Sequence, residues 1–153
     1  MTEHRQWIPS YLSLGSNIEN RQAHMAHAEY LINRNPKINI QKKSQILDNP
    51  PLLVENQPPF LNQVFLTETQ LGPYELLDTL KDYENQIGRI KRIRFGPREI
   101  DLDILSYGQL RLDSDRLTIP HPALRDREYL RILLAEFDTT PEDLLNQATR
   151  SEI

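Results

Sequence analysis

The order of strand-like and helix-like segments is the feature that most limits how this chain can fold. Alternating or β-rich apolar residues predict strands, and apolar residues three or four positions apart predict amphipathic helices. In chain order, these segments are a strand at 8–14, a helix beginning after Asn20, strands at 38–46 and 60–69, a helix opened by Gly72-Pro73 and closed by Gly88, and a strand at 100–106. This order predicts an α+β fold of the ferredoxin-like βαββαβ type, with an antiparallel sheet and both helices on one face. The other face would then be free for a ligand.

The segments between and after these elements contain residues that end regular structure. Asn20 predicts a cap on the first helix, and Asn35-Pro36 ends that helix. Residues 48–59 contain four prolines and little periodicity, which predicts a loop. The remaining predicted elements are a short hairpin arm at 109–119 and helices near 123–135 and 141–148. No repeat, low-complexity tract or linker is evident, so residues 1–153 are expected to form a single domain.

The composition excludes several classes of protein. The net charge of −4 argues against a dedicated nucleic-acid-binding protein, which is usually basic. The absence of cysteine excludes disulfides, thiolate catalysis and cysteine-based zinc sites. No apolar run approaches the roughly 18 residues that a membrane span requires, and the N-terminus lacks a signal pattern. We therefore expect a cytoplasmic monomer that binds small molecules and neither nucleic acid nor membranes.

Two aspartates within an apolar run mark the candidate functional site. Asp101 and Asp103 alternate with Ile100, Leu102 and Ile104. On a strand, residues two positions apart project from the same face, so both carboxylates point one way and the apolar side chains point the other way. Carboxylates beside an apolar layer are costly unless cations compensate their charge.

A basic segment immediately precedes the aspartates. Its cationic residues are Arg89, Lys91, Arg92, Arg94 and Arg98. Carboxylates can hold a magnesium ion while arginines hold phosphate oxygens, so the combination predicts an enzyme that binds a magnesium-bound nucleotide. An Asp-x-Asp pair alone is more often a surface pair, and a basic run alone is more often a solvated loop. Their adjacency in this chain favours the enzyme.

Five short motifs also occur in the order and at the spacings of a known enzyme family. They are Leu14-Gly-Ser-Asn17, Gln57-Pro-Pro-Phe-Leu-Asn62, Gly88-Arg89, Arg94-Phe-Gly-Pro-Arg-Glu-Ile-Asp-Leu-Asp-Ile-Leu105 and Leu117-Thr-Ile-Pro-His-Pro122. In these motifs the chain resembles 6-hydroxymethyl-7,8-dihydropterin pyrophosphokinase of folate biosynthesis, over roughly residues 8–137. The resemblance implies a ferredoxin-like sheet, ATP as co-substrate and about two Mg²⁺ ions. It also implies transfer of pyrophosphate from ATP to the pterin hydroxymethyl group, with release of AMP.

The resemblance implies roles for individual residues. The metal ligands would be Asp101 and Asp103. The catalytic, phosphate-binding arginines would be Arg89, Arg92 and Arg98. The residues that bind ATP would be Arg89, Arg98, Ile104, Arg116, Thr118, His121 and Arg127. The residues that bind the pterin would be Asn49, Pro50, Leu52, Phe60, Asn62, Phe95 and Tyr129, a set with the aromatic faces and amides that a flat ring requires.

The chain departs from the family pattern around the expected pterin loop. Leu47-Asp48-Asn49-Pro50 stands where the family often has Tyr-x-Thr-Pro, and Leu52-Leu53-Val54 stands where it often has a glycine. Phe95 replaces a frequent tryptophan, which keeps an aromatic face but loses the indole N–H donor. We therefore expect altered contacts to the pterin. A different magnesium-dependent nucleotide phosphoryl transferase, or a relative that has lost turnover, stays open as an alternative.

Other interpretations stay open for the whole chain and for single residues. An RNA-binding ferredoxin-like module would require a basic surface and exposed aromatics, which the acidic net charge and the sheet carboxylates oppose. Phe60 and Tyr129 are, by periodicity alone, typical of core residues, and His121 of a turn. Asn17 and Asn62 could serve only to bond loop backbone. Glu84, at the end of the second helix, either orients the basic segment by pairing with an arginine or lies on a solvated helix face.

Overall fold

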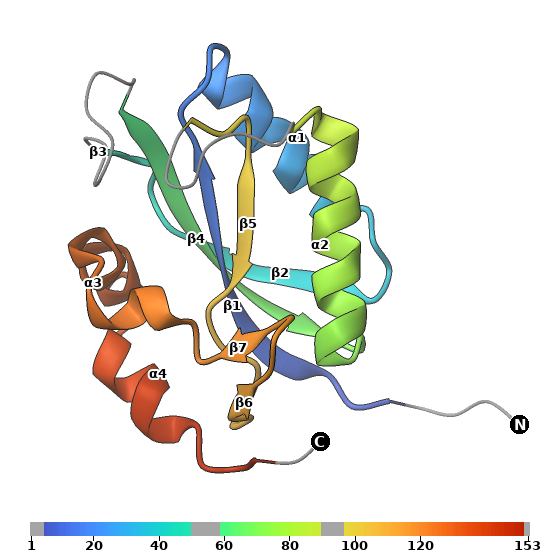
Figure 1. The fold of residues 1–153 in the computed structure, drawn as a ribbon, viewed down its shortest axis with the longest axis vertical. Coiled ribbons are helices and arrows are strands. Elements are labelled where there is room, and N and C mark those ends of the chain that lie inside the picture. Colours follow the sequence, from blue (N-terminus) through green and yellow to red (C-terminus); the bar gives the residue numbers. More distant parts are fainter. Residues whose placement is uncertain (1–4, 50–58, 90–96, 152–153) are drawn as a thin grey trace, which may run out of the picture.

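An antiparallel sheet forms the centre of the protein (Figure 1). The computed structural model describes residues 5–49, 59–89 and 97–151. The strands are β1 (Ile8–Ser16), β2 (Ile38–Lys43), β3 (Leu47–Asn49), β4 (Phe60–Thr69) and β5 (Asp101–Ile104), with a separate ribbon of β6 (Leu112–Asp113) and β7 (Thr118–Ile119). The strand order is β2-β4-β1-β5, β3 also pairs with β4, and every pairing is antiparallel.

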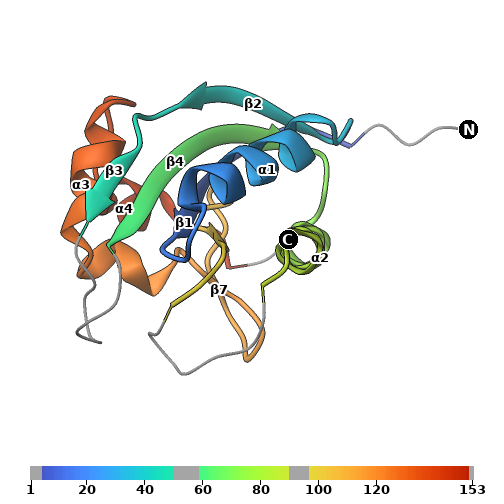
Figure 2. The same ribbon diagram turned by 90° about the horizontal axis from the view of Figure 1, so that it is seen from above.

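The described residues contain four α-helices. They are α1 (Arg21–Asn33), α2 (Pro73–Ile87), α3 (Glu128–Ala135) and α4 (Pro141–Gln147), and a 3₁₀ turn, η1, spans Pro122–Arg125. Figure 2 shows α1 and α2 together, apart from α3 and α4. These helices and the antiparallel sheet confirm the predicted α+β class. Within the described ranges, no helix combines the length and the apolar character needed to cross a membrane.

One face of the sheet packs against α1 and α2. Leu14 of β1 and Leu102 and Ile104 of β5 are buried in this core together with apolar residues of both helices. Because side chains alternate along a strand, Asp101 and Asp103 project from the opposite face. The sequence prediction for the direction of these carboxylates therefore agrees with the burial of their neighbours.

The opposite face of the sheet is only partly open. A second apolar cluster lies on it, containing Val64 of β4, Leu105 after β5, and Leu130 and Leu133 of α3. The expectation that this face would be free for a ligand is therefore wrong where the C-terminal helices cover it. Amphipathic periodicity shows which side of a helix is buried, but it does not show which surface buries it.

Three predicted elements differ from the observed ones in detail. The strand predicted at 38–46 ends at Lys43 as β2, and β3 begins only at Leu47, so Ile46 lies in neither strand. The pairing of β2 with β4 also shifts register between Ile40 and Lys42. Asn20 precedes α1 in a left-handed conformation (φ 71°) and makes no side-chain cap. The helix predicted at 123–135 begins only at Glu128, since the 3₁₀ turn η1 comes first.

Candidate active site

A row of residues crosses three neighbouring strands on the partly open face. Gly15 of β1 lies opposite Asp101 of β5 on one side and opposite Asn62 of β4 on the other. Ser13, two positions earlier on β1, lies opposite Asp103. Directly paired residues of antiparallel strands point their side chains to the same face, about 5 Å apart. The register therefore brings the expected metal ligands and an expected pterin-binding amide onto one surface.

Gly15 leaves space in the middle of this row. A Cβ atom at Gly15 would lie 2.9 Å from Nδ2 of Asn62 and 3.7 Å from Cδ1 of Phe60. Oδ1 of Asn62 in turn accepts a hydrogen bond of 3.0 Å from Nδ2 of Asn49. Three residues expected to bind the pterin thus gather at the bare backbone of one glycine, where a flat ring could approach the sheet.

The charge of the Asp103 carboxylate is not fully compensated by its surroundings. Burial and the charge of Asp101 raise the pKa of Asp103 to about 7. The charges of Arg127, Arg89 and Lys81 act in the opposite direction without cancelling this rise. The Asp103 side chain remains 43% exposed, so a ligand can reach it. A bound cation would relieve the repulsion between such like charges.

The donor set fits a magnesium ion shared with a nucleotide. In the part of the chain that the structure describes, no cluster of three or more histidine, cysteine, aspartate or glutamate side chains could hold a metal unaided. Mg²⁺ is commonly held by one or two carboxylates together with substrate phosphates and water. Asp101 and Asp103, both on β5, can supply the carboxylates, and a nucleotide would supply the phosphate oxygens.

Arg89 is held beside the carboxylates by the way α2 ends. Gly88 adopts a left-handed conformation (φ 108°), which lets the chain turn back on the helix. The backbone N–H of Arg89 then donates to the carbonyl of Glu84 at 3.0 Å. The Arg89 guanidinium lies 2.8 Å from Glu84 and 3.3 Å from Asp101. The helix end therefore fixes both the backbone and the side chain of this expected catalytic arginine.

Arg98 is anchored to the end of β1 by Asn17. Oδ1 of Asn17 accepts a hydrogen bond of 2.7 Å from the backbone N–H of Arg98, and the N–H of Asn17 donates to the Arg98 carbonyl at 3.0 Å. Asn17 is fully buried, so bonding this loop backbone is its observed role. Nη1 of Arg98 donates to the carbonyl of Pro97 at 2.9 Å. The reciprocal pair connects the start of the carboxylate strand to the first motif of the chain.

His121 presents a neutral donor next to Asp103. Its Nδ1 accepts a hydrogen bond of 3.0 Å from the N–H of Ala123, which leaves the ring proton on Nε2. Nε2 lies 3.8 Å from Oδ1 of Asp103. Burial and the charge of Arg127 lower the pKa of His121, so the ring is neutral at pH 7. Such an imidazole can donate a hydrogen bond to a phosphate oxygen.

A cavity of about 280 Å³ adjoins the carboxylates. The expected site residues that line it are Asp103, Ile104, Arg116, Thr118 and His121. Lys81 of α2 and Ser114 of the β6–β7 ribbon also line it, and the sequence analysis missed both. Lys81 precedes Glu84 by three residues on α2, and this helical spacing was the available signal. The volume lies near the lower end of ligand pockets, about 300–1,000 Å³, which suits part of a nucleotide.

The remaining expected residues include Arg116, which contacts α2, and Arg127, which lies by Tyr129 of α3. Arg116 pairs with Asp78 of α2, and its guanidinium lies 5.2 Å from the centre of the Tyr74 ring. Arg127 lies by Tyr129, where burial raises the pKa of the tyrosine hydroxyl and the arginine partly offsets the rise. The expected site residues that lie outside the described ranges are Pro50, Leu52, Arg92 and Phe95.

Comparison with known proteins identifies the family. A family model described as 7,8-dihydro-6-hydroxymethylpterin-pyrophosphokinase (HPPK) matches residues 11–139. The chain belongs to the HPPK family. The matched range includes every residue that the motif resemblance assigned to the site, and the resemblance itself is confirmed.

Named relatives of this HPPK chain include enzymes of similar length and longer proteins. A 2-amino-4-hydroxy-6-hydroxymethyldihydropteridine pyrophosphokinase of Bacillus subtilis is 35% identical over 127 residues, which cover 83% of this chain and 76% of the relative. The Haemophilus influenzae protein of the same name is 36% identical over 129 residues, covering 84% and 81%. A mitochondrial folate synthesis bifunctional protein of Arabidopsis thaliana is 43% identical over 129 residues, but these are only 22% of its length.

Solved structures show the same fold at low identity. Plasmodium falciparum HPPK-DHPS A437G with pteroate matches with a TM-score of 0.69 at 14% identity, covering 95% of this chain. The wild-type HPPK-DHPS of the same organism matches with a TM-score of 0.63 at 13% identity. This chain spans 44% and 45% of those two proteins, less than half of each.

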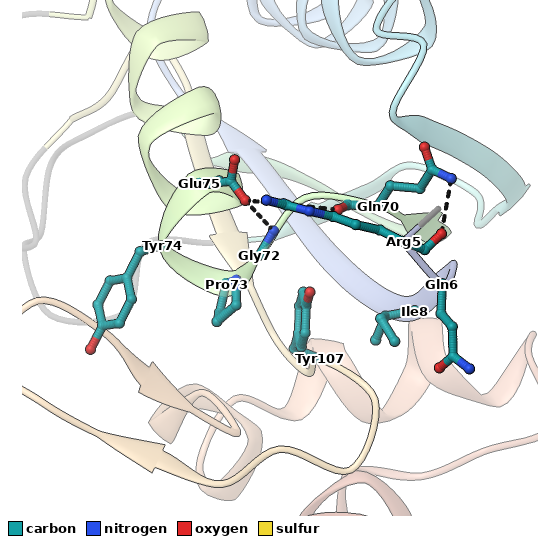
Figure 3. Close-up of a pocket in the computed structure, with 9 residues that line it drawn as sticks. All are labelled: Arg5, Gln6, Ile8, Gln70, Gly72, Pro73, Tyr74, Glu75 and Tyr107. Carbon is teal, nitrogen blue, oxygen red and sulfur yellow. Dashed lines mark hydrogen bonds and ion pairs between the residues drawn. The ribbon is translucent and has the colours of Figure 1, made fainter. Parts of the chain in front are cut away.

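A second cavity lies by the first turn of α2 (Figure 3), whereas Arg89 follows the last turn of this helix. Its volume is about 550 Å³, and residues of the N-terminal segment and of the first turn of α2 line it. Among its described lining residues, Glu75 is the single carboxylate, and it is engaged by Arg5 and by the N–H of Gly72. At 1.5 Å per residue, Glu75 and Glu84 are about 14 Å apart along the helix. This cavity therefore lacks the carboxylate pair that phosphate transfer with magnesium would use.

Gly15→Ala is expected to weaken pterin binding selectively. The added methyl group would meet Asn62 at 2.9 Å, so the amide must move and lose its bond from Asn49. Loss of one such hydrogen bond predicts a rise of about tenfold in KM for the pterin. KM for ATP should stay the same, and steady-state kinetics with each substrate varied in turn measures both constants.

Gly108→Ala is the matched control for this prediction. Gly108 has a positive φ of 52°, and a Cβ there would lie 3.0 Å from Ile8, at the opposite end of β1 from Gly15. The control should lower the melting temperature without changing either KM. A Gly15→Ala variant in which both KM values rise equally, or neither rises, would contradict the assignment of Asn62 to the pterin.

Proposed function

We propose that this protein transfers a pyrophosphoryl group from ATP to the hydroxymethyl oxygen of 6-hydroxymethyl-7,8-dihydropterin and releases AMP, a step of folate biosynthesis. Family membership and the names of its relatives support this activity. In the structure, the observation that carries the proposal is the row from Asp101 through Gly15 to Asn62. A nucleotide phosphoryl transferase with another acceptor would share the carboxylates but would have no use for the amide group beside Gly15.

Asp101 and Asp103 would hold magnesium together with the phosphates of ATP. The bound metal would supply positive charge where negative charge develops on the phosphate oxygens. The raised pKa of Asp103 and its position on the same strand face as Asp101 support this role. The Asp103 carboxylate, which is costly to ionise beside Asp101, ionises readily once it faces a cation.

Arginine and histidine side chains would provide the remaining donors. Phosphoryl transfer depends on positioning and electrostatic stabilisation more than on a strong base. Arg89 at the end of α2 and Arg98 before β5 would hold the phosphate oxygens as their charge grows. Neutral His121 would donate a hydrogen bond from Nε2. The nucleoside part of ATP would occupy the cavity between Lys81 and Thr118.

The pterin would lie across Gly15 on the same face. Asn62 and Asn49 would bond its polar edge, and Phe60 would contact the ring. Adjacent strands are about 4.8 Å apart, so the backbones at Asn62 and Asp101 are about 10 Å apart. A bicyclic ring at Asn62 can then extend its hydroxymethyl group toward phosphates held at Asp101, as attack on the β-phosphorus requires.

Product analysis tests the proposal. Purified protein is incubated with ATP and magnesium, with and without 6-hydroxymethyl-7,8-dihydropterin, and the nucleotides are separated. AMP that forms only with the pterin present is the expected result, because attack on the β-phosphorus releases AMP. Formation of ADP would mean a different phosphoryl transfer. Pterin binding without turnover would mean a relative that has lost catalysis.

We also infer the finer class of the fold. The antiparallel order β2-β4-β1-β5, with α1 and α2 packed on one face, supports a ferredoxin-like split βαβ unit to which β3 is added. We propose that residues 1–153 act as one domain and as a monomer. Sedimentation of the purified chain tests the monomer, and a dimer would contradict it.

A further inference from the structure

Glu84 is a buried carboxylate beside the site to which the proposed reaction assigns no role. It lies in the last turn of α2, and only 5% of its surface is exposed. The sequence left open whether this residue pairs with an arginine or lies on a solvated helix face. Its burial excludes the solvated face. A carboxylate this buried requires specific partners to be stable.

The two oxygens of Glu84 contact two different parts of the site. Oε1 accepts a hydrogen bond of 2.8 Å from Nη1 of Arg89. Oε2 accepts a hydrogen bond of 2.7 Å from the backbone N–H of Leu102, the residue between the two aspartates. One side chain therefore connects a phosphate-binding arginine to the strand that carries the metal ligands.

Glu84 accepts from two donors that need a partner, the backbone N–H of Leu102 and the guanidinium of Arg89. In the described sheet, β5 is an edge strand of four residues that pairs with β1 alone, so the N–H groups on its outer edge need partners from elsewhere. Glu84 supplies one of these partners. Arg89 contacts Asp101 through Nη2 at 3.3 Å, and a magnesium ion bound to Asp101 would compete with this contact.

We propose that Glu84 is a positioning residue that keeps Arg89 at the phosphates while Asp101 holds magnesium. The inference rests on the proposed function, because it assumes that Arg89 engages the phosphates of ATP. Glu84 uses Nη1 of Arg89 and leaves Nη2 free to turn from Asp101 to a phosphate oxygen. Its bond to Leu102 supports the strand, whereas its bond to Arg89 is the one that the positioning role requires.

Glu84→Gln separates these two roles. The glutamine oxygen can still accept from the N–H of Leu102, whereas its NH₂ group would face the donors of Arg89. We expect kcat to fall about 10- to 100-fold, as for other supporting partners of a reactive centre, with KM for the pterin and the melting temperature nearly unchanged. In an Arg89→Ala background, Glu84→Gln should cause no further loss of kcat, because the group it acts through is gone.

Glu75→Gln is the matched control. Glu75 lies on the same helix and also pairs with an arginine, Arg5 (Figure 3), but in the first turn of the helix, about 14 Å along its axis from Glu84. Its replacement should leave kcat unchanged. If Glu84→Gln does not fold, Glu84→Asp, whose shorter side chain cannot reach Arg89 and Leu102 together, is measured alone and with Arg89→Ala. A loss of kcat that disappears with Arg89→Ala then acts through Arg89.

Two results would overturn the inference. The first is a folded Glu84→Gln variant with the kcat of the wild type. The second is a double variant with Arg89→Ala whose fall in kcat equals the product of the two single falls. Wild-type protein in the same assay separates this failure from that of the proposed function. An active wild type with an unaffected variant refutes only the role of Glu84, whereas a wild type that forms no AMP refutes the pyrophosphokinase itself.

Discussion

Asp103→Asn is expected to lower kcat about a thousandfold or more, because a bound metal supplies several kcal/mol of transition-state stabilisation. Asparagine keeps the shape of the side chain but removes the charge that would hold magnesium. Asp103 lies on the same face of β5 as Asp101, and each of the two pairs with a residue of β1. The remaining carboxylate cannot hold the cation in the same position, so the loss should persist even when raised magnesium fills the weakened site. Single-turnover measurement of AMP formation checks this.

The fold should survive this substitution. Because the pKa of Asp103 rises from 3.8 to about 7 on folding, the folded state loses stability as pH rises through this range, and asparagine removes the full cost that is present at pH 8. We therefore expect the metal-free variant to melt at or above the wild-type temperature at pH 8. Asp82→Asn, which removes an exposed charge that accepts a hydrogen bond from Gln86 on α2, is the control and should retain full activity. Activity retained by Asp103→Asn would remove this residue from the metal site.

Much of the site could be predicted from sequence because its decisive signals are local. The spacing of Asp101 and Asp103 by two residues in an apolar run determines which face each side chain takes once the segment is a strand. Gly88 after an amphipathic helix predicts a left-handed end, and the observed φ of 108° agrees. Arg89 follows directly, so its position at the helix end was also within reach of the sequence.

The features that escaped prediction depend on contacts between distant segments. The pairing of Gly15 with both Asp101 and Asn62 is a matter of register, which no local pattern reveals. Glu84 could be read two ways because its partner N–H, on Leu102, is 18 residues away in sequence. Likewise, α3 covers part of the sheet face opposite α1 and α2 through contacts with β4, a segment distant in sequence.

Arg98→Ala should slow chemistry far more than it weakens ATP binding. The charge on the phosphate oxygens is greatest in the transition state, so a guanidinium aimed at them acts mainly there. Loss of one such donor predicts a fall in kcat of about 100- to 1,000-fold, with KM for ATP changed only slightly. The backbone of residue 98 should stay in place, because Asn17 bonds its N–H at 2.7 Å and its carbonyl at 3.0 Å.

The control for this variant is Arg131→Ala. Arg131 is an exposed arginine of α3 that pairs with Glu142 at 2.5 Å, and its loss should leave kcat and both KM values unchanged. Binding of a non-hydrolysable ATP analogue, measured by titration, separates affinity from rate. A weaker analogue affinity with unchanged kcat would mean that Arg98 binds the ground state as strongly as the transition state. We expect instead a lower kcat with an unchanged analogue affinity. Asn17 fixes the backbone of Arg98, and a group already held in place can stabilise developing charge without rearrangement.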